Sequence, residues 1–302
     1  MPAPVVDFHV HLFPPDIRDR REDHCLRDLA FGHLYSDPRS RLATAEDALA
    51  AMDAASVDHA IALGFGWSDA TVCRDHNDYL ADVVRRHPDR FTAFGAVQPA
   101  DPASATREID RFPSLGLRGI GELMPHLQGY SLDGPTMAVV AEAAQAKGLI
   151  VLTHASEPVG HEYSGKGDVS PTSIVGLAAA FPELRIVAAH WGGGLPFYAL
   201  MPEVARTLSN VYFDSAATTY LYRPEVYRIV SELVGAEHVL FGSDFPLLRP
   251  GPMLRKLRAL ALPAGALEMI LGGSAAALLG LGSAVGRSGG RWRTYGEGPT
   301  AE

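Results

Sequence analysis

Short runs of apolar residues alternate with longer stretches of helical periodicity along most of the chain. The apolar runs predict eight strands, at residues 4–9, 59–63, 91–97, 117–122, 149–154, 185–190, 210–214 and 238–244. Most of these runs are nearly continuous rather than alternating, which is typical of parallel strands buried on both faces. The pattern therefore predicts a parallel sheet covered by helices.

The stretches between the runs carry the start and stop signals of helices. Residues 135–147 begin with Pro135 and stop before Gly148, and residues 75–87 stop before Pro88. Further helices are predicted at residues 48–55, 103–112, 172–181, 196–208, 224–234, 253–260, 264–271 and 274–279. Eight strand–helix units in succession predict a (β/α)8 TIM barrel. An open doubly wound sheet has the same rhythm but usually carries a glycine-rich phosphate turn after its first strand, where this chain has His9-Val10-His11.

An inserted loop, residues 14–43, breaks the rhythm between the first strand and the first helix. Loops of this length in a compact domain are usually functional. Phe13 stands just before the loop, and His24, Phe31, His33 and Tyr35 lie within it. In a barrel the loop would lie over the mouth, on the side where the strands end. We interpret it as a substrate lid or pocket wall, the alternative being an ordinary surface excursion.

The remaining features of the chain set its domain organisation and general class. Residues 1–281 are predicted to form the barrel domain, and the glycine-rich residues 282–302 a flexible C-terminal tail. A net charge of −9 argues against a protein that grips nucleic acid through surface charge. Two cysteines exclude a disulfide framework and an all-cysteine zinc site. We expect no membrane span and no signal peptide in MPAPVVDFHVH, and so a cytoplasmic protein.

Polar side chains close several of the apolar runs, at positions where burial is expected: His9, His11, Glu122, His154, His190 and Asp244. In an extended chain residues i and i+2 point to the same side, so the first two imidazoles converge. In a barrel all these strand ends meet at one face, where active sites of this architecture lie. An isolated buried histidine or carboxylate is costly unless it is paired or bound to a metal. The set therefore predicts a site for a divalent metal.

The ligand types narrow the choice of metal without fixing the number of ions. Zinc is the first choice for imidazole ligands, and manganese, iron or cobalt fit the same donors. The absence of cysteine ligands is typical of a catalytic site. Four side chains would suffice for one ion and a water molecule: His9, His11, His154 and Asp244. His190 would then bind a second ion or act on the substrate, and Glu122 would bridge two ions or act as a base.

The expected chemistry is activation of water by the bound cation, which makes hydroxide available near neutral pH. Asp244 would accept the proton of that water and later pass it to the leaving group. The metal and His190 would stabilise the charge that develops on the electrophilic oxygen.

Six segments carry the functional residues: VVDFHVHLFP, LRGIGELMPHLQGY, LIVLTHASEPVGHEYSGKG, LRIVAAHWGGGLPFY, NVYFDSAA and HVLFGSDFP. Over residues 4–281 the chain resembles the amidohydrolase superfamily, and most of all its amidohydrolase-2 branch of metal-dependent TIM-barrel hydrolases and decarboxylases. The resemblance implies that His9, His11, His154 and Asp244 are metal ligands. It also implies that His190 either binds metal or contacts substrate.

Two departures from the branch bear on the reaction. Decarboxylases of the branch commonly have an ExHxH pattern, where this chain has Asp7 in place of the glutamate. No lysine closes the fourth strand, and Glu122 stands near that place, as in TatD-type deoxyribonucleases with a bridging carboxylate. We predict a metal-dependent hydrolase that attacks an amide, lactone or ester with activated water. The alternatives are a non-oxidative decarboxylase of an aromatic or unsaturated acid, a TatD-like phosphoesterase, and a metal-binding protein without turnover.

Several further residues are predicted to surround the metal. Phe13, His161 and Trp191 are the candidates for substrate contact, although Trp191 fits packing against a neighbouring helix equally well. Asp214, at the end of the seventh strand, would orient a ligand histidine through its second ring nitrogen, or else simply cap a helix. The expected partner is a small-molecule substrate, with neither nucleic acid nor membrane. A homodimer is an expectation that the resemblance alone supplies.

Overall fold

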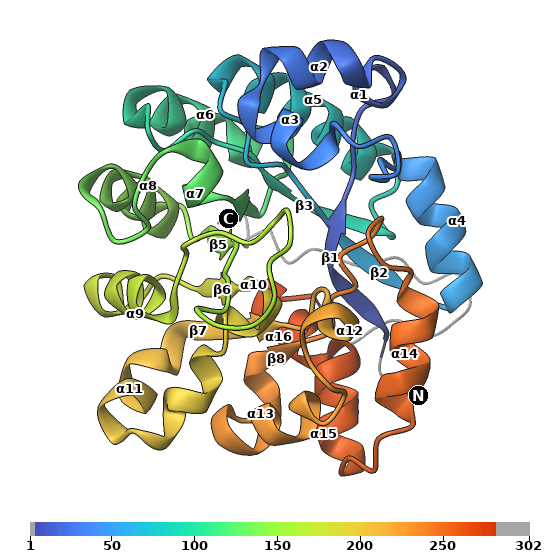
Figure 1. The fold of residues 1–302 in the computed structure, drawn as a ribbon, viewed down its shortest axis with the longest axis vertical. Coiled ribbons are helices and arrows are strands. Elements are labelled where there is room, and N and C mark those ends of the chain that lie inside the picture. Colours follow the sequence, from blue (N-terminus) through green and yellow to red (C-terminus); the bar gives the residue numbers. More distant parts are fainter. Residues whose placement is uncertain (1–3, 282–302) are drawn as a thin grey trace, which may run out of the picture.

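Eight parallel strands in the order β1 to β8 form the centre of the protein, which we describe from a computed structural model covering residues 4–281 (Figure 1). The strands are β1 (Val6–His11), β2 (His59–Leu63), β3 (Phe91–Gly95), β4 (Gly119–Leu123), β5 (Ile150–Thr153), β6 (Ile186–Ala188), β7 (Val211–Asp214) and β8 (Val239–Leu240). The amides of Phe8 and His11 bond to the carbonyls of Phe241 and Phe245, which joins the last strand segment to the first. The predicted TIM barrel is therefore confirmed. The predicted tail, residues 282–302, lies outside the described residues.

Helices surround the strands in the order that the sequence predicts. The larger ones are α4 (Ala45–Ala55), α5 (Ala70–Arg86), α6 (Pro102–Leu115), α8 (Pro135–Ala146), α9 (Pro171–Ala180), α11 (Pro202–Thr207), α13 (Val226–Val234), α14 (Pro250–Arg258), α15 (Ala264–Glu268) and α16 (Ser274–Leu279). Short turns of helix lie between them: α7 (Pro125–Gln128), α10 (Ala189–Gly192), η1 (Leu195–Leu200), η2 (Leu208–Asn210), α12 (Thr218–Leu221), η3 (Ala236–His238) and η4 (Met269–Gly273). No helix within residues 4–281 combines the length and the apolar character needed to cross a membrane.

The helix predicted at residues 196–208 is divided in the structure into η1, α11 and η2. Met201 has extended backbone, and Pro202 begins a new helix. A proline lacks the N–H that a continuing helix needs, so the break falls at that position.

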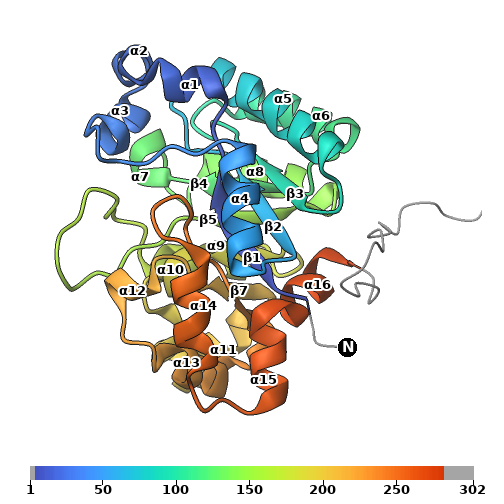
Figure 2. The ribbon, with the colours of Figure 1, turned by 90° about the vertical axis from the view of Figure 1, so that its right-hand side faces the viewer.

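The insertion after β1 is helical rather than an open loop. It contains α1 (Pro15–Asp19), α2 (Arg21–Arg27) and α3 (Leu29–Tyr35). Asp28 caps α3 by accepting from the amide of Phe31 at 2.9 Å, and it also accepts from the amide of Ser68 at 2.8 Å. This carboxylate therefore both starts the helix and ties it to the loop after β2. Figure 2 shows α3 on the same side of the barrel as the long loop that follows β5.

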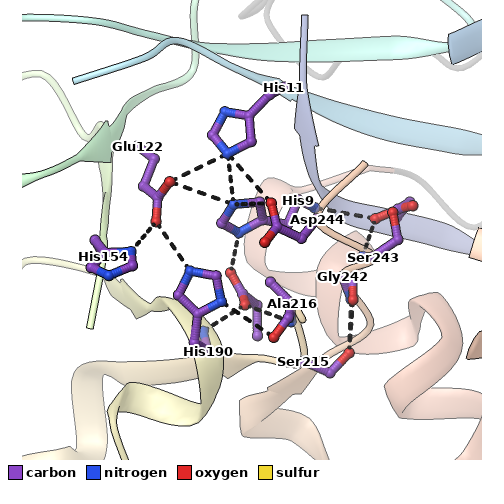
Figure 3. A network of polar contacts seen from close by, with 12 residues as sticks. His9, His11, Glu122, His154, His190, Ser215, Ala216, Gly242, Ser243 and Asp244 are labelled. Carbon is purple, nitrogen blue, oxygen red and sulfur yellow. Dashed lines mark hydrogen bonds and ion pairs between the residues drawn. The ribbon is translucent and has the colours of Figure 1, made fainter. Parts of the chain in front are cut away.

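The barrel interior is apolar at the end where the strands begin. Val6 and Phe8 of β1 pack there with the interior side chains of the other strands, and Leu278 and Leu279 of α16 close that end. A register shift between Asp7 and Val10 changes the alternation in β1. His9 and His11 consequently both point into the interior at the opposite end, toward Glu122 (Figure 3).

Candidate metal centre

All six strand-end residues singled out in the sequence gather at this opposite end of the barrel (Figure 3). Each of the six is buried, with less than a tenth of its surface exposed: His9, His11, Glu122, His154, His190 and Asp244. Their donor atoms reach the same small volume from five strands, because the C-terminal ends of parallel barrel strands converge there.

A first group of donors surrounds the imidazoles of β1. Nε2 of His9 lies 3.1 Å from Nε2 of His11. Oε2 of Glu122 lies 3.6 Å and 3.3 Å from these two nitrogens, and Oδ1 of Asp244 lies 3.8 Å and 3.7 Å from them. Converging nitrogen and carboxylate lone pairs of this kind suit a divalent cation. The donor set therefore fits the metal predicted from the sequence.

A second group lies on the other side of Glu122. Its Oε1 is 3.1 Å from Nδ1 of His154 and 3.5 Å from Nε2 of His190. Two sets of three, His9–His11–Glu122 and Glu122–His154–His190, each have ligand atoms within 4.8 Å of one another. The sequence placed His154 with the β1 histidines, whereas the structure turns it to the far oxygen of Glu122. Glu122 is therefore the central residue of the site.

The electrostatics of the site keep Glu122 ionised. Burial disfavours its carboxylate, but His9, His11 and neighbouring imidazoles hold the pKa of Glu122 well below its ordinary value. Burial also opposes charge on His9, yet the carboxylates of Asp214 and Glu122 raise the pKa of that histidine well above its ordinary value. Glu122 and Asp244 likewise outweigh burial at His190 and raise its pKa to about 9. Each buried group thus depends on an oppositely charged neighbour.

Asp214, at the end of β7, holds two of the histidines. Its Oδ2 lies 2.9 Å from Nδ1 of His9, and its Oδ1 accepts from the amide of His190 at 3.0 Å. The contact with a site histidine predicted for Asp214 is therefore present. A hydrogen bond at Nδ1 directs the lone pair of Nε2 toward the other donors.

Two of the site residues have left-handed backbone conformations. The φ angles of His190 and Asp244 are 54° and 65°, in the region that non-glycine residues rarely adopt. Both residues follow their strands, since β6 ends at Ala188 and β8 at Leu240, earlier than the apolar runs predicted. Such conformations cluster at functional sites, where the surrounding structure holds them in place.

Sequence reasoning missed the structural role of Asp7. This buried carboxylate accepts from the amide of Ser243 at 2.8 Å and from the amide of His9 at 3.3 Å. Burial raises its pKa to about 6, although these hydrogen bonds lower it in part. Asp7 thereby fixes the segment just before Asp244 against β1. The signal was present in the sequence as an acid in the middle of an apolar run.

A cavity of about 370 Å³ opens over the donors. His11, Glu122, His154, His190 and Asp244 lie at its polar end. The rest of the lining is mostly apolar or aromatic and includes Leu34, Tyr35, Met124, Tyr220, Leu221 and Leu247. Its polar members are Ser40, Arg41, His161 and Ser164. The insertion thus contributes to the wall of this cavity, as the sequence predicted, since Leu34 and Tyr35 belong to α3.

The three predicted substrate contacts have different positions. His161 lines the cavity. Phe13 is instead fully buried in an aromatic cluster with Phe31 and Trp67, and it does not line the cavity. Trp191 is also fully buried, and its Nε1 donates to Oγ1 of Thr218 at 2.9 Å. Both aromatic residues therefore belong to the core of the fold, where their rings are buried against other side chains.

Comparison with known proteins identifies the family. A family model described as Amidohydrolase matches residues 6–281. The chain belongs to the amidohydrolase family. The fold of this amidohydrolase resembles that of 5-carboxyvanillate decarboxylase from Sphingomonas paucimobilis, with a TM-score of 0.76, 22% identity, and coverage of 91% of this chain and 98% of the other. A 5-carboxyvanillate decarboxylase from Novosphingobium aromaticivorans, solved in complex with manganese, gives a TM-score of 0.74 at 20% identity, covering 91% of this chain and 96% of the other.

Curated relatives of this amidohydrolase include decarboxylases. The 2-amino-3-carboxymuconate-6-semialdehyde decarboxylase of Dictyostelium discoideum is 25% identical over 237 residues, 68% of this chain and 65% of the relative. The gamma-resorcylate decarboxylase of a Polaromonas species is 22% identical over 218 residues, 57% of this chain and 65% of the relative. The matches thus span about 65% of the length of these relatives. They favour the alternative reaction of the sequence analysis, decarboxylation, over the hydrolysis that we predicted first.

Proposed function

We propose that this amidohydrolase is a metal-dependent, non-oxidative decarboxylase of a small aromatic or unsaturated carboxylic acid. The observation that carries the proposal is the cavity, with metal-ligand donors at one end and largely apolar walls elsewhere. A flat acid would place its carboxylate and an adjacent oxygen against the donors and its ring or double bonds between the walls. The names of the relatives support the same class of substrate.

The chain's own residues divide the work of binding. His9, His11, Glu122 and Asp244 would hold a divalent ion, because their donor atoms converge. The ion, when bound, supplies Lewis acidity that orients the acid and stabilises negative charge. Tyr35 is positioned along the cavity to exclude water from the ring.

Decarboxylation requires a proton at the carbon that loses its carboxylate. The C–C bond breaks with release of CO2, the electron pair stays on the carbon, and a proton replaces the lost group. His190 lines the cavity, and its Nε2 lies 3.5 Å from Oε1 of Glu122 beside the donors, so we assign it as the donor of that proton through Nε2. Asp244, also in the lining, is the second candidate for proton transfer.

Hydrolysis is the second candidate function, and one specific observation favours it. The two oxygens of Glu122 face separate histidine pairs, His9 with His11 and His154 with His190. A carboxylate in this position suits a pair of ions, and two-ion sites are common in enzymes that cleave esters and amides with water.

Product analysis decides between the two reactions. The protein, reconstituted with zinc or with manganese, is incubated in H₂¹⁸O with hydroxybenzoates, unsaturated dicarboxylic acids, lactones and esters. The proposal predicts CO2 release equal to substrate loss, without ¹⁸O in the organic product, and loss of this activity in the variant His190→Gln. Incorporation of ¹⁸O into a cleaved lactone or ester, with no CO2 from any acid, would replace decarboxylation with hydrolysis.

A further inference from the structure

A second cavity, of about 350 Å³, lies beside the metal cavity. It is formed by the loop after β5, the η1 segment and the end of α12 with the residue that follows. Four aromatic side chains line it: Tyr163, Phe197, Tyr198 and Tyr222. The two cavities have His161, Tyr163 and Leu221 in common, so these residues separate them.

One acid, Glu157, lies in this lining together with one histidine, His161. Glu157 is half-buried, and its Oε2 accepts from the hydroxyl of Tyr163 at 3.2 Å. Its Oε1 is buried and has no hydrogen-bond partner within the described part of the chain. Among the described residues, no arginine or lysine lines this cavity, and Lys166 of the same loop pairs with Glu162 at 2.9 Å. Glu157 therefore faces no permanently charged base among the described residues of the lining.

The aromatic rings add to this negative potential. Phe197 and Tyr198 remain 39% and 49% exposed, so both side chains are accessible to a ligand. The rings of Phe197 and Tyr222 lie 6.4 Å apart with planes inclined by 40°. Burial, followed by the proximity of Glu157, raises the pKa values of Tyr163 and Tyr222, so both stay neutral phenols at ordinary pH. Neutral aromatic faces attract cations, most strongly where water is partly excluded.

We propose that this cavity binds the ammonium group of a small organic cation, with Glu157 as its counter-ion and the aromatic rings as its walls. A quaternary or tertiary ammonium suits the site better than a metal ion, because the lining offers one carboxylate and several ring faces. The cation is either a free ligand or an amine substituent of a molecule whose other end reaches the metal cavity. The shared wall residues allow the second arrangement.

Isothermal titration calorimetry of the metal-loaded protein tests this site with choline and its neutral isostere, 3,3-dimethylbutan-1-ol. Choline is expected to bind at least about tenfold more tightly than the isostere, because only choline carries the charge. Glu157→Gln should abolish this preference, and Phe197→Leu should weaken choline binding several-fold. The matched control Glu162→Gln removes the same charge from an exposed position in the same loop and should bind choline as the wild type does.

Equal affinities for choline and the isostere, or unchanged choline binding in Glu157→Gln, would overturn the proposal. Thermal unfolding of each variant shows whether the fold is retained, and Phe197, which is 39% exposed, provides a variant at a position that is not fully buried. A second titration, with salicylate present, separates the two sources of the cation. Competition indicates a substituent that reaches into the metal cavity, and simultaneous binding indicates a separate ligand; either result supports the site.

Discussion

Individual hydrogen bonds decide which ring nitrogens of the metal centre are free to bind a cation. His9 places Nδ1 against Asp214 at 2.9 Å, which leaves Nε2 for the donor set. Asp214 also holds the amide of His190, so one carboxylate orients residues on both sides of Glu122. Outer carboxylates of this kind fix ring orientation and raise ligand basicity.

Asp214→Asn should therefore weaken metal binding without removing any of the proposed ligands. We expect a loss of affinity of about 10- to 100-fold for zinc or manganese, the usual effect of removing such an outer partner. Competition against a chromophoric chelator measures it. Asp133→Asn, at an exposed position away from the site, should leave the affinity unchanged. Equal affinities in Asp214→Asn and wild type would show that Asp214 does not orient His9.

His76 should make folding stability depend on pH. This buried histidine accepts from Nε1 of Trp67 at 2.9 Å and lies 2.6 Å from the carbonyl of Leu12, and burial lowers its pKa from 6.5 to about 4. Because the pKa of His76 is lower in the folded than in the unfolded state, neutral His76 stabilises the fold fully above pH 6.5. This contribution to the free energy of unfolding is lost as the pH falls toward 4.

The comparison variant is His76→Gln in chelator-treated protein. Its deficit in the free energy of unfolding relative to wild type should shrink by up to about 3 kcal/mol between pH 7 and pH 4. Urea denaturation at both pH values measures this change. A deficit that is constant with pH would mean that His76 is not held neutral in the folded state.

The sequence predicted the members of the metal centre but not their arrangement. The residue types and their places at the ends of apolar runs sufficed to select all six side chains. The central position of Glu122 depends on side-chain torsions and on the register shift in β1, neither of which leaves a periodic signal. The same holds for Asp7, whose partner Ser243 is distant in the chain.

At the scale of elements, the insertion after β1 is held by an aromatic cluster rather than by long helices. Phe31 of α3 stacks on Trp67 with ring centroids 5.0 Å apart and lies 5.8 Å from Phe13. Since Leu34 and Tyr35 of the same helix line the metal cavity, this cluster positions part of the substrate wall.

Removing the central ring of this cluster should loosen the insertion before it affects the barrel. Phe31→Ala deletes a fully buried side chain, a change that usually costs about 3 kcal/mol or more. Limited proteolysis should then cut within residues 14–43 at least about tenfold faster than in wild type. Leu29→Ala, on the same helix at 83% exposure, is the control and should behave as wild type. Equal cleavage rates in both variants would contradict this account of the insertion.

The pattern of apolar positions could not reveal the helices of the insertion. α1, α2 and α3 have five, seven and seven residues, too short for a clear helical period. They exist because Asp28 caps α3 and because the aromatic side chains find partners elsewhere in the chain. The ends of the longer helices were predicted unevenly. The bounds of α8 and α9 agree with the prediction to within one residue, whereas α5 begins at Ala70 rather than at residue 75 and α6 continues past Pro113 to Leu115.

In the whole molecule, the side chains that stabilise the fold and the candidate metal ligands lie at opposite ends of the barrel. Side chains of α16 close the end where the strands begin, and the metal-ligand donors occupy the other end. Changes at the closed end should therefore alter unfolding without altering the metal centre.

Gly272 provides a test at the closed end. A Cβ at this position would lie 2.0 Å from the carbonyl oxygen of Pro4, so Gly272→Ala should destabilise the fold by about 1–3 kcal/mol. Gly265 in α15 has open space around it, and Gly265→Ala should stabilise the protein by about 0.5–1 kcal/mol. Chemical denaturation measures both, and metal affinity should be unchanged in both. A loss of metal affinity in Gly272→Ala would contradict the separation of the two ends.

The central claim is that the buried donor set at the barrel mouth binds a divalent metal. Metal content per chain, measured by inductively coupled plasma mass spectrometry on protein purified without added metal or chelator, tests it most directly. The account predicts at least one ion per chain in the wild type and its loss in the double variant His9→Ala, His11→Ala. Two ions in the wild type, with fewer in Glu122→Ala, would identify Glu122 as a bridge. A wild-type protein that binds no ion, even after reconstitution with zinc or manganese, would contradict the account.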